Sequence, residues 1–192
     1  MLWIVRRGIL GGTFDPPHLA HMIAGEAAYR ELGLSLVTFM PAGVPWQKSG
    51  SEVTGSGHRW EMTRRTVAGI EYFEADSREV KRSGRTYTAD TLASFPASDE
   101  LFLILGADAA AGLPTWSRPE EVLARAQVVV MPRPGIEANR VESVIGTVHW
   151  LDTPLLPISG TLLRGRRRAG ASLRFLVRDE VLAYIESCGL YA

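Results

Sequence analysis

The sequence predicts an α/β fold, with one doubly wound, mostly parallel sheet and helices on both of its faces. Apolar segments of strand length alternate with stretches of helical spacing along the whole chain. This alternation is typical of parallel sheets built from βαβ units. Two irregular stretches, residues 47–57 and 133–139, are too short to separate two domains. We therefore expect a single domain that spans residues 1–192.

The individual elements follow from the spacing of apolar residues. Residues 2–10 form an apolar run that ends at two glycines, and apolar side chains then recur at helical spacing. Pro132 ends a later strand, because proline cannot donate a hydrogen bond to a sheet. The pattern predicts strands at residues 2–10, 34–40, 101–105 and 128–131. It predicts helices at residues 18–32, 58–69, 88–95, 119–125, 160–168 and 176–187.

Composition limits the class of protein. Of 192 residues, 46% are apolar and 22% charged, as in soluble globular domains. Apolar runs such as Leu101–Leu105 are far shorter than the ~18 residues of a membrane span. Twenty-one basic residues balance twenty-one acidic ones, whereas nucleic-acid binders usually carry a basic domain. Cys188 is the single cysteine, and residues 1–10 show no signal peptide. We expect a cytoplasmic protein without a nucleic-acid or membrane partner, of unpredicted oligomeric state.

The segment from Gly11 to His21 says more about ligand binding than any other part of the sequence. Two glycines end a predicted strand and permit close approach of the backbone to a ligand. Ligands of open α/β sheets bind beyond the carboxyl ends of the strands, and a helix N-terminus favours phosphate. His18 and His21 lie three residues apart in the first turn of the following helix. A role in binding phosphate would explain why the two histidines lie together. Local packing and metal binding are the alternative roles, although the spacing supplies no third metal ligand.

The sequence GGTFDPPHLAH (11–21) resembles the HxGH signature of the nucleotidyltransferase superfamily that includes the class I aminoacyl-tRNA synthetases. Its flanking residues are most similar to the bacterial nicotinate-mononucleotide adenylyltransferases. The resemblance runs over nearly the whole chain and implies a Rossmann-like fold. It also implies that Gly12, Thr13 and Phe14 contact ATP. Ala20 replaces the signature glycine, and its methyl group is expected to narrow the approach to the nucleotide.

The resemblance continues on the mononucleotide side. Lys48 follows the second predicted strand in a segment similar to the family's substrate loop, although Gln47 departs from the common histidine. A lysine there suits phosphate as a mobile point charge. By the resemblance, the backbone at Thr88 holds the nicotinate carboxylate, while Trp116 and Ser117 form the partner segment that stacks on the ring. By residue type alone, Lys48 can be a solvated loop residue, Thr88 a helix cap and Trp116 a core residue.

On the adenosine side, Gly106 and Asp108 follow the predicted strand 101–105. A carboxylate at the end of a strand suits ribose hydroxyls, although a helix cap also explains Asp108. Arg133 follows the next strand and is expected to meet a phosphate. The sequence ISGTLLR (158–164) resembles the family signature SxTxxR, which would hold pyrophosphate at a second helix N-terminus. The signature residues are Ser159, Thr161 and Arg164.

The resemblance implies adenylyl transfer from ATP to nicotinate mononucleotide, which gives deamido-NAD and pyrophosphate. It assigns His21 to the α-phosphate, His18 to the β/γ end and Arg164 to the leaving pyrophosphate. Mg²⁺ would be held by phosphates and water, with no protein ligand to the metal. Nicotinamide mononucleotide or pantetheine phosphate stay open as acceptors, although pantetheine has no ring to stack on Trp116. A nucleotide-sensing module and a purely structural glycine turn also stay open.

Overall fold

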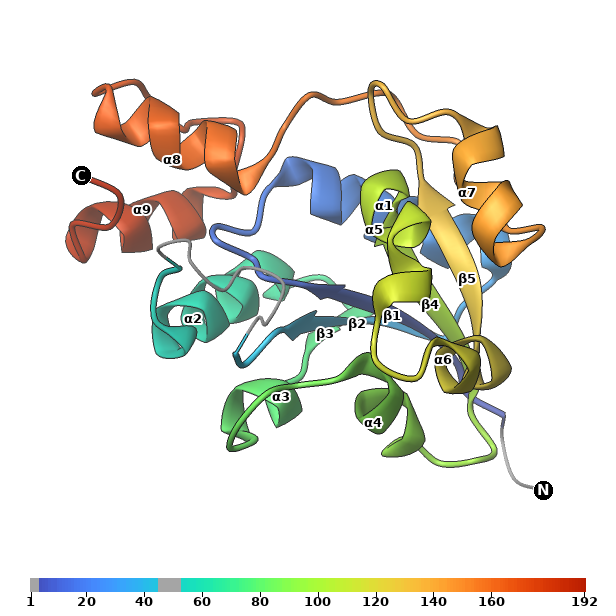
Figure 1. The fold of residues 1–192 in the computed structure, drawn as a ribbon. Helices are drawn as coiled ribbons and strands as arrows, with labels where there is room; N and C mark the ends of the chain where they lie inside the picture. The colour runs from blue at the N-terminus through green and yellow to red at the C-terminus, as the bar shows by residue number, and fades with distance from the viewer. Residues whose placement is uncertain (1–3, 45–52) are drawn as a thin grey trace.

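The centre of the computed structural model, which describes residues 4–44 and 53–192, is a six-stranded sheet (Figure 1). Its strand order is β3-β2-β1-β4-β5-β6, and every described pair is parallel. The doubly wound sheet is therefore confirmed, and it is more uniformly parallel than predicted. The strands are β1 Arg6–Gly12, β2 Leu36–Pro41, β3 Phe73–Ala75, β4 Glu100–Gly106, β5 Ala126–Met131 and β6 His149–Trp150.

The strand order fixes where a ligand can bind. From β1 the sheet grows towards β2 and β3 on one side, and β4 to β6 follow on the other. The chain therefore reverses its direction of growth between β1 and β4. In open α/β sheets the crevice at this reversal, beyond the carboxyl ends of the strands, is the usual binding site.

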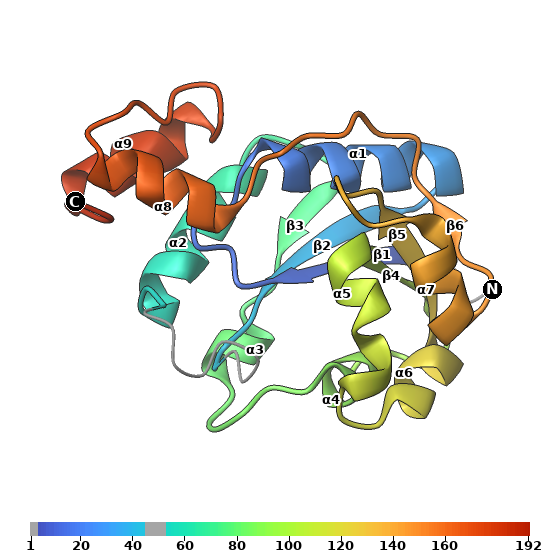
Figure 2. The same ribbon diagram turned by 45° about the horizontal axis from the view of Figure 1, so that its top comes forward.

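Helices cover both faces of the sheet (Figures 1 and 2). Along β4, Leu101, Leu103 and Leu105 belong to one apolar cluster and Phe102 and Ile104 to another, because successive side chains alternate between faces. The first face is covered by α4 (Thr88–Ala93), α5 (Ala107–Ala111), α6 (Pro119–Arg125) and α7 (Ala138–Ile145). The second face is covered by α1 (Leu19–Leu32) and α2 (Ser56–Val67).

The helices α8 (Gly160–Arg168) and α9 (Asp179–Ser187) lie beside α1 and α2 rather than on the sheet (Figure 2). They share a third apolar cluster with Ala20 of α1 and Met62 of α2. The backbone N–H of Leu19 also donates to the carbonyl of Leu176 over 2.9 Å. The chain after residue 158 is thus fixed against the first turn of α1, where the two histidines lie.

Several elements were not predicted. β3, β6, α3 (Arg78–Lys81), α5 and the 3₁₀ helix η2 (Leu113–Thr115) are two to five residues long, which is too short for a visible period. The eight residues of α7 begin inside the stretch expected to be irregular. Val141 and Ile145 lie four residues apart and pack on the first apolar face, but so short a helix shows little of its period in the sequence. No helix within residues 4–44 or 53–192 is long and apolar enough to cross a membrane.

Candidate active site

A pocket of about 340 Å³ opens at the carboxyl end of the sheet, between β1 and β4. Its lining comes from the ends of β1, β2, β4 and β5 and from the first turns of α1, α4 and α5. The pocket therefore occupies the crevice that the strand order predicts. It brings together predicted residues from distant parts of the chain, namely Gly12, Thr13, His21, Thr88, Gly106, Asp108, Trp116, Ser117 and Arg133.

The two histidines stack on each other at the start of α1. Their ring centroids lie 3.8 Å apart, with 26° between the planes. The backbone N–H of His18 donates to Nδ1 of His21 over 3.1 Å. A ring nitrogen that accepts a hydrogen bond carries no proton, so this bond assigns the ring proton of His21 to Nε2. His21 lines the pocket, so its ring lies next to a ligand bound there.

His18 is buried, with 3% of its surface exposed. Burial, and then the positive charge of Arg133, lower the pKa of His18 from 6.5 to about 3. The imidazole is therefore neutral near pH 7. A contact between His18 and a phosphate would be a hydrogen bond from a neutral donor, not an ion pair.

The glycine turn presents backbone to the pocket. Gly12 and Thr13 line the pocket, whereas Phe14 lies outside its described lining. Contact between Phe14 and ATP stays a prediction. The Phe14 ring is 2% exposed and meets His21 edge-on, with the centroids 4.9 Å apart. Its packing therefore fixes the orientation of the His21 ring.

Ala20 also faces away from the pocket. It is 1% exposed and belongs to the apolar cluster shared with α8 and α9. Its effect on the approach of the nucleotide stays a prediction. In this fold the methyl group adds to the contact between α1 and the helices that follow residue 158.

The opposite wall of the pocket comes from α3, α4 and the segment after η2. Thr88 is the first residue of α4, as predicted, and Trp116 and Ser117 follow η2. Trp116 is half-buried and packs partly against the first apolar face. Glu79 of α3, which the sequence analysis did not single out, also lines this wall. Burial raises the pKa of Glu79, and its carboxylate accepts a hydrogen bond from the Thr91 hydroxyl over 2.7 Å.

Asp108 and Arg133 form the floor near the ends of β4 and β5. The N-cap of α5 is Gly106, so Asp108 is not the cap of this helix. A Cβ atom on Gly106 would lie 2.7 Å from Oδ1 of Asp108, so glycine leaves room for the carboxylate. Nε of Arg133 lies 3.8 Å from the same oxygen, and its Nη1 donates to the carbonyl of Ile158 over 3.0 Å. Arg133 thus connects the pocket to the segment that leads into α8.

The start of α8 has the predicted cap. The Ser159 hydroxyl accepts from the backbone N–H of Leu162 over 3.2 Å. Nη1 of Arg164 donates to the carbonyl of Asp15 over 2.8 Å, and its Nη2 lies 3.5 Å from Oγ1 of Thr161. Arg164 therefore reaches the loop that leads into α1. Ser159, Thr161 and Arg164 lie outside the described lining of the pocket, and Lys48 lies outside the described residues.

Three residues that shape the glycine turn were not singled out. Arg59 of α2 is 1% exposed, and burial lowers its pKa. Its guanidinium donates to four backbone carbonyls, those of Thr13, Ala42, Gly43 and Thr54. The other two are Asp15 and Tyr191, which share a hydrogen bond. Asp15 lies within the sequence GGTFDPPHLAH, which carries the resemblance, whereas an arginine in a helix gives no signal of burial.

The described residues of this site offer a divalent metal few protein ligands. Among the described residues, no group of three or more His, Cys, Asp or Glu could hold a metal ion. The buried carboxylate of Asp15 already accepts hydrogen bonds from the Thr54 N–H and the Tyr191 hydroxyl. Mg²⁺ commonly binds through substrate phosphates and water where the protein supplies few ligands.

Comparison with known proteins identifies the family. The cytidylyltransferase-like family matches residues 9–166. Curated relatives include the probable nicotinate-nucleotide adenylyltransferases of Desulfitobacterium hafniense, 38% identical over 97% of this chain and 95% of theirs, and of Salinibacter ruber, 39% identical over 96% of both. A solved structure of Plasmodium falciparum nicotinic acid mononucleotide adenylyltransferase complexed with NaAD has the same fold, with a TM-score of 0.80, 16% identity and 97% of both chains covered.

The chain therefore belongs to the cytidylyltransferase-like family and is a nucleotidyltransferase. Within this family it belongs to the nicotinate-nucleotide adenylyltransferases, with relatives that match nearly its full length.

Proposed function

We propose that this chain transfers the adenylyl group of ATP to nicotinate mononucleotide, and that the pocket between β1 and β4 is the site of the reaction. The observation that carries the proposal is the composition of that one pocket. His21 and the glycine turn line it on one side, and Thr88, Trp116 and Ser117 line it on the other. A triphosphate beside the turn and a pyridine ring beside the indole would meet within a single cavity.

The reaction needs alignment of two anions more than proton transfer. A phosphate oxygen of the mononucleotide attacks the α-phosphorus of ATP, the bond from that phosphorus to the bridging oxygen breaks, and pyrophosphate leaves. The second pKa of a phosphate monoester lies near ~6, so the nucleophile is largely dianionic at pH 7 and requires no general base. Catalysis then rests on positioning and on stabilising the charge that develops on the phosphates.

We propose a separate role for each of three residues of the two motifs. His21 would donate from Nε2 to an oxygen of the α-phosphate, since its Nδ1 is held by the His18 backbone. His18 would donate as a neutral ring towards the β/γ end. Arg164, with Ser159 and Thr161 at the start of α8, would hold the leaving pyrophosphate. Lys48 and Arg133 would meet phosphates of the substrates, and Asp108 would meet a ribose.

Mg²⁺ would neutralise part of the phosphate charge when it is bound with ATP. We propose that phosphate oxygens and water hold the ion, since the described residues supply no cluster of ligands. We also propose that the enzyme acts in the cytoplasm without a nucleic-acid partner.

Measurement of pyrophosphate release tests the function. Purified protein is given ATP and Mg²⁺ with nicotinate mononucleotide, nicotinamide mononucleotide or pantetheine phosphate in parallel. We expect the highest kcat/KM with nicotinate mononucleotide. Faster turnover of another acceptor would replace the substrate in the proposal, whereas tight ATP binding without any pyrophosphate release would identify a sensing module.

A pair of histidine variants tests the site. His21→Ala should lower kcat by at least ~10²-fold, the scale for loss of one preorganised donor to developing charge. His149→Ala is the matched control, because His149 pairs with Glu31 at β6, away from the pocket, and it should keep wild-type turnover. Near-full turnover by His21→Ala in saturating substrates would contradict the assignment of His21.

A further inference from the structure

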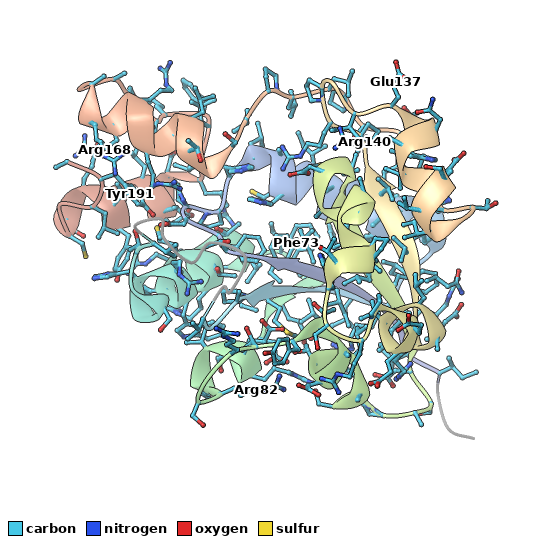
Figure 3. All side chains as sticks on the ribbon, in the orientation of Figure 1. Phe73, Arg82, Glu137, Arg140, Arg168 and Tyr191 are labelled. Atoms are coloured by element: carbon cyan, nitrogen blue, oxygen red, sulfur yellow. The ribbon has the colours of Figure 1, made fainter. Side chains whose placement is uncertain are left out.

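The carboxylate of Asp15 is buried inside the glycine turn, with 2% of the side chain exposed. Its Oδ2 accepts from the backbone N–H of Thr54 over 3.1 Å, and its Oδ1 accepts from the Tyr191 hydroxyl over 2.6 Å. Tyr191 lies on the side of the molecule formed by α2, α8 and α9 (Figure 3). One hydroxyl from the far end of the sequence is thus bound to the loop that carries the family signature.

Asp15 also contacts Arg164, the proposed pyrophosphate ligand. Nη1 of Arg164 donates to the Asp15 carbonyl over 2.8 Å and lies 3.8 Å from the carboxylate oxygen Oδ2. A Cβ atom on Gly160 would lie 2.7 Å from the same carbonyl oxygen. The start of α8 therefore touches Asp15 closely, and the direction of Arg164 depends on where Asp15 is held.

We propose that Tyr191 is a positioning residue for adenylyl transfer: its hydroxyl holds the Asp15 carboxylate so that Arg164 stays available to the leaving pyrophosphate. This inference rests on the proposed function.

The hydrogen-bond donors near the Asp15 carboxylate explain how the Tyr191 hydroxyl would affect Arg164. Without it, Oδ1 of Asp15 would lose a charge-assisted hydrogen bond inside a buried site, and the carboxylate would seek another donor. The guanidinium of Arg59 is already engaged by four backbone carbonyls. Arg164 is already at 3.8 Å. The carboxylate would therefore draw Arg164 towards itself and away from a phosphate.

Two properties of Tyr191 agree with a fixed donor. Burial and the hydrogen bond to Asp15 raise the pKa of the Tyr191 hydroxyl above its ordinary value, so the group stays protonated as a donor. Its backbone φ is 63°, a left-handed conformation that a bulky residue rarely adopts unless its surroundings hold it.

The experiment compares two tyrosines of the same segment. Tyr191→Phe removes the hydroxyl bound to Asp15 but keeps the ring, which packs on the third apolar cluster. Tyr184→Phe is the matched control, because it removes a hydroxyl that bonds Nδ1 of His58 over 2.8 Å, between α9 and α2. Pyrophosphate release is measured with ATP varied at saturating nicotinate mononucleotide, and then with the mononucleotide varied at saturating ATP. Thermal unfolding of each variant is recorded alongside.

We expect Tyr191→Phe to lower kcat/KM for ATP about tenfold, the scale of one lost charge-assisted hydrogen bond, and to leave the KM for the mononucleotide within about twofold. Tyr184→Phe should stay within about twofold of wild type for both substrates. Unchanged ATP kinetics in Tyr191→Phe would overturn the inference. The inference would also be overturned if kcat/KM fell equally for both substrates and Tyr184→Phe gave the same loss, because that result indicates a merely structural role.

Asp15→Asn gives a second test. The amide oxygen can still accept from Tyr191, but the charge that would draw Arg164 is gone. In the Asp15→Asn background, the further change Tyr191→Phe should therefore alter kcat/KM for ATP by no more than about twofold. This comparison also serves if Tyr191→Phe alone does not fold. A further loss of about tenfold in that background, so that the two effects multiply, would overturn the inference. Wild-type protein that releases no pyrophosphate would instead overturn the proposed function, before any variant is compared.

Discussion

Burial of His18 should make the stability of the protein depend on pH. Burial and the charge of Arg133 hold its pKa at about 3 in the folded chain, against an ordinary value of 6.5. The unfolded chain thus binds a proton that the folded chain does not, so the free energy of unfolding falls as the pH drops below about 6.5. Between pH 7 and pH 5 this loss is about 2 kcal/mol. Because the folded pKa lies well below 5, the figure depends almost entirely on the unfolded value.

The substitution His18→Gln removes the titrating group and keeps a polar side chain of similar length. Urea unfolding of wild type and variant at pH 7 and pH 5 gives four free energies. Groups that titrate equally in both proteins cancel in the difference, which leaves the contribution of His18. Wild type should lose about 2 kcal/mol more than the variant over this pH interval. Equal losses in the two proteins would refute the reasoning that His18 is a buried, neutral imidazole.

Three further substitutions test other parts of the site. Arg59→Met leaves four backbone carbonyls without their donor, so urea unfolding should show a loss of at least about 3 kcal/mol, which the exposed control Arg30→Met should not show. Gly160→Ala places a Cβ atom 2.7 Å from the Asp15 carbonyl oxygen, so the start of α8 must move. We expect this displacement to lower kcat roughly ten- to hundredfold in steady-state assays, and a wild-type kcat would contradict this. Burial raises the pKa of Glu79, so its ionised form costs stability at neutral pH. Glu79→Gln should therefore unfold at a higher temperature than wild type at pH 7, and the advantage should vanish below about pH 4, where the unfolded carboxyl is also protonated.

The longer strands and helices could be predicted from the sequence, because their apolar residues repeat at regular spacing over many positions. The apolar run that ends at Gly12 and the helix after His18 were both predicted, because each carries a clear pattern over many residues. β3 and β6 were not, because strands of three and two residues cannot show alternation. Their pairing depends on neighbours that are distant in the sequence, which local patterns do not encode.

Residues proposed from motifs came together in the structure, whereas residues whose role is packing were not singled out from the sequence. The structure places His21 and Trp116 in one pocket. The buried donors of Arg59 were not predictable, because burial of a charged residue depends on which carbonyls the fold leaves unpaired. The orientation of Ala20 also escaped sequence reasoning. The motif gives its position on α1, but only the placement of α8 and α9 decides what its methyl group meets.

The bond between Asp15 and Tyr191 joins positions 176 residues apart. During folding, α1 can form from local contacts and β1 can pair with β2, the next strand along the chain, whereas this bond joins the first loop to the last residues of the sequence. Contacts of such long separation form late, because closing a long loop costs entropy before the contact is made. By the proposal above, catalytic competence requires this late contact, and we expect a polypeptide terminated before residue 191 to assemble the strands yet turn over ATP poorly.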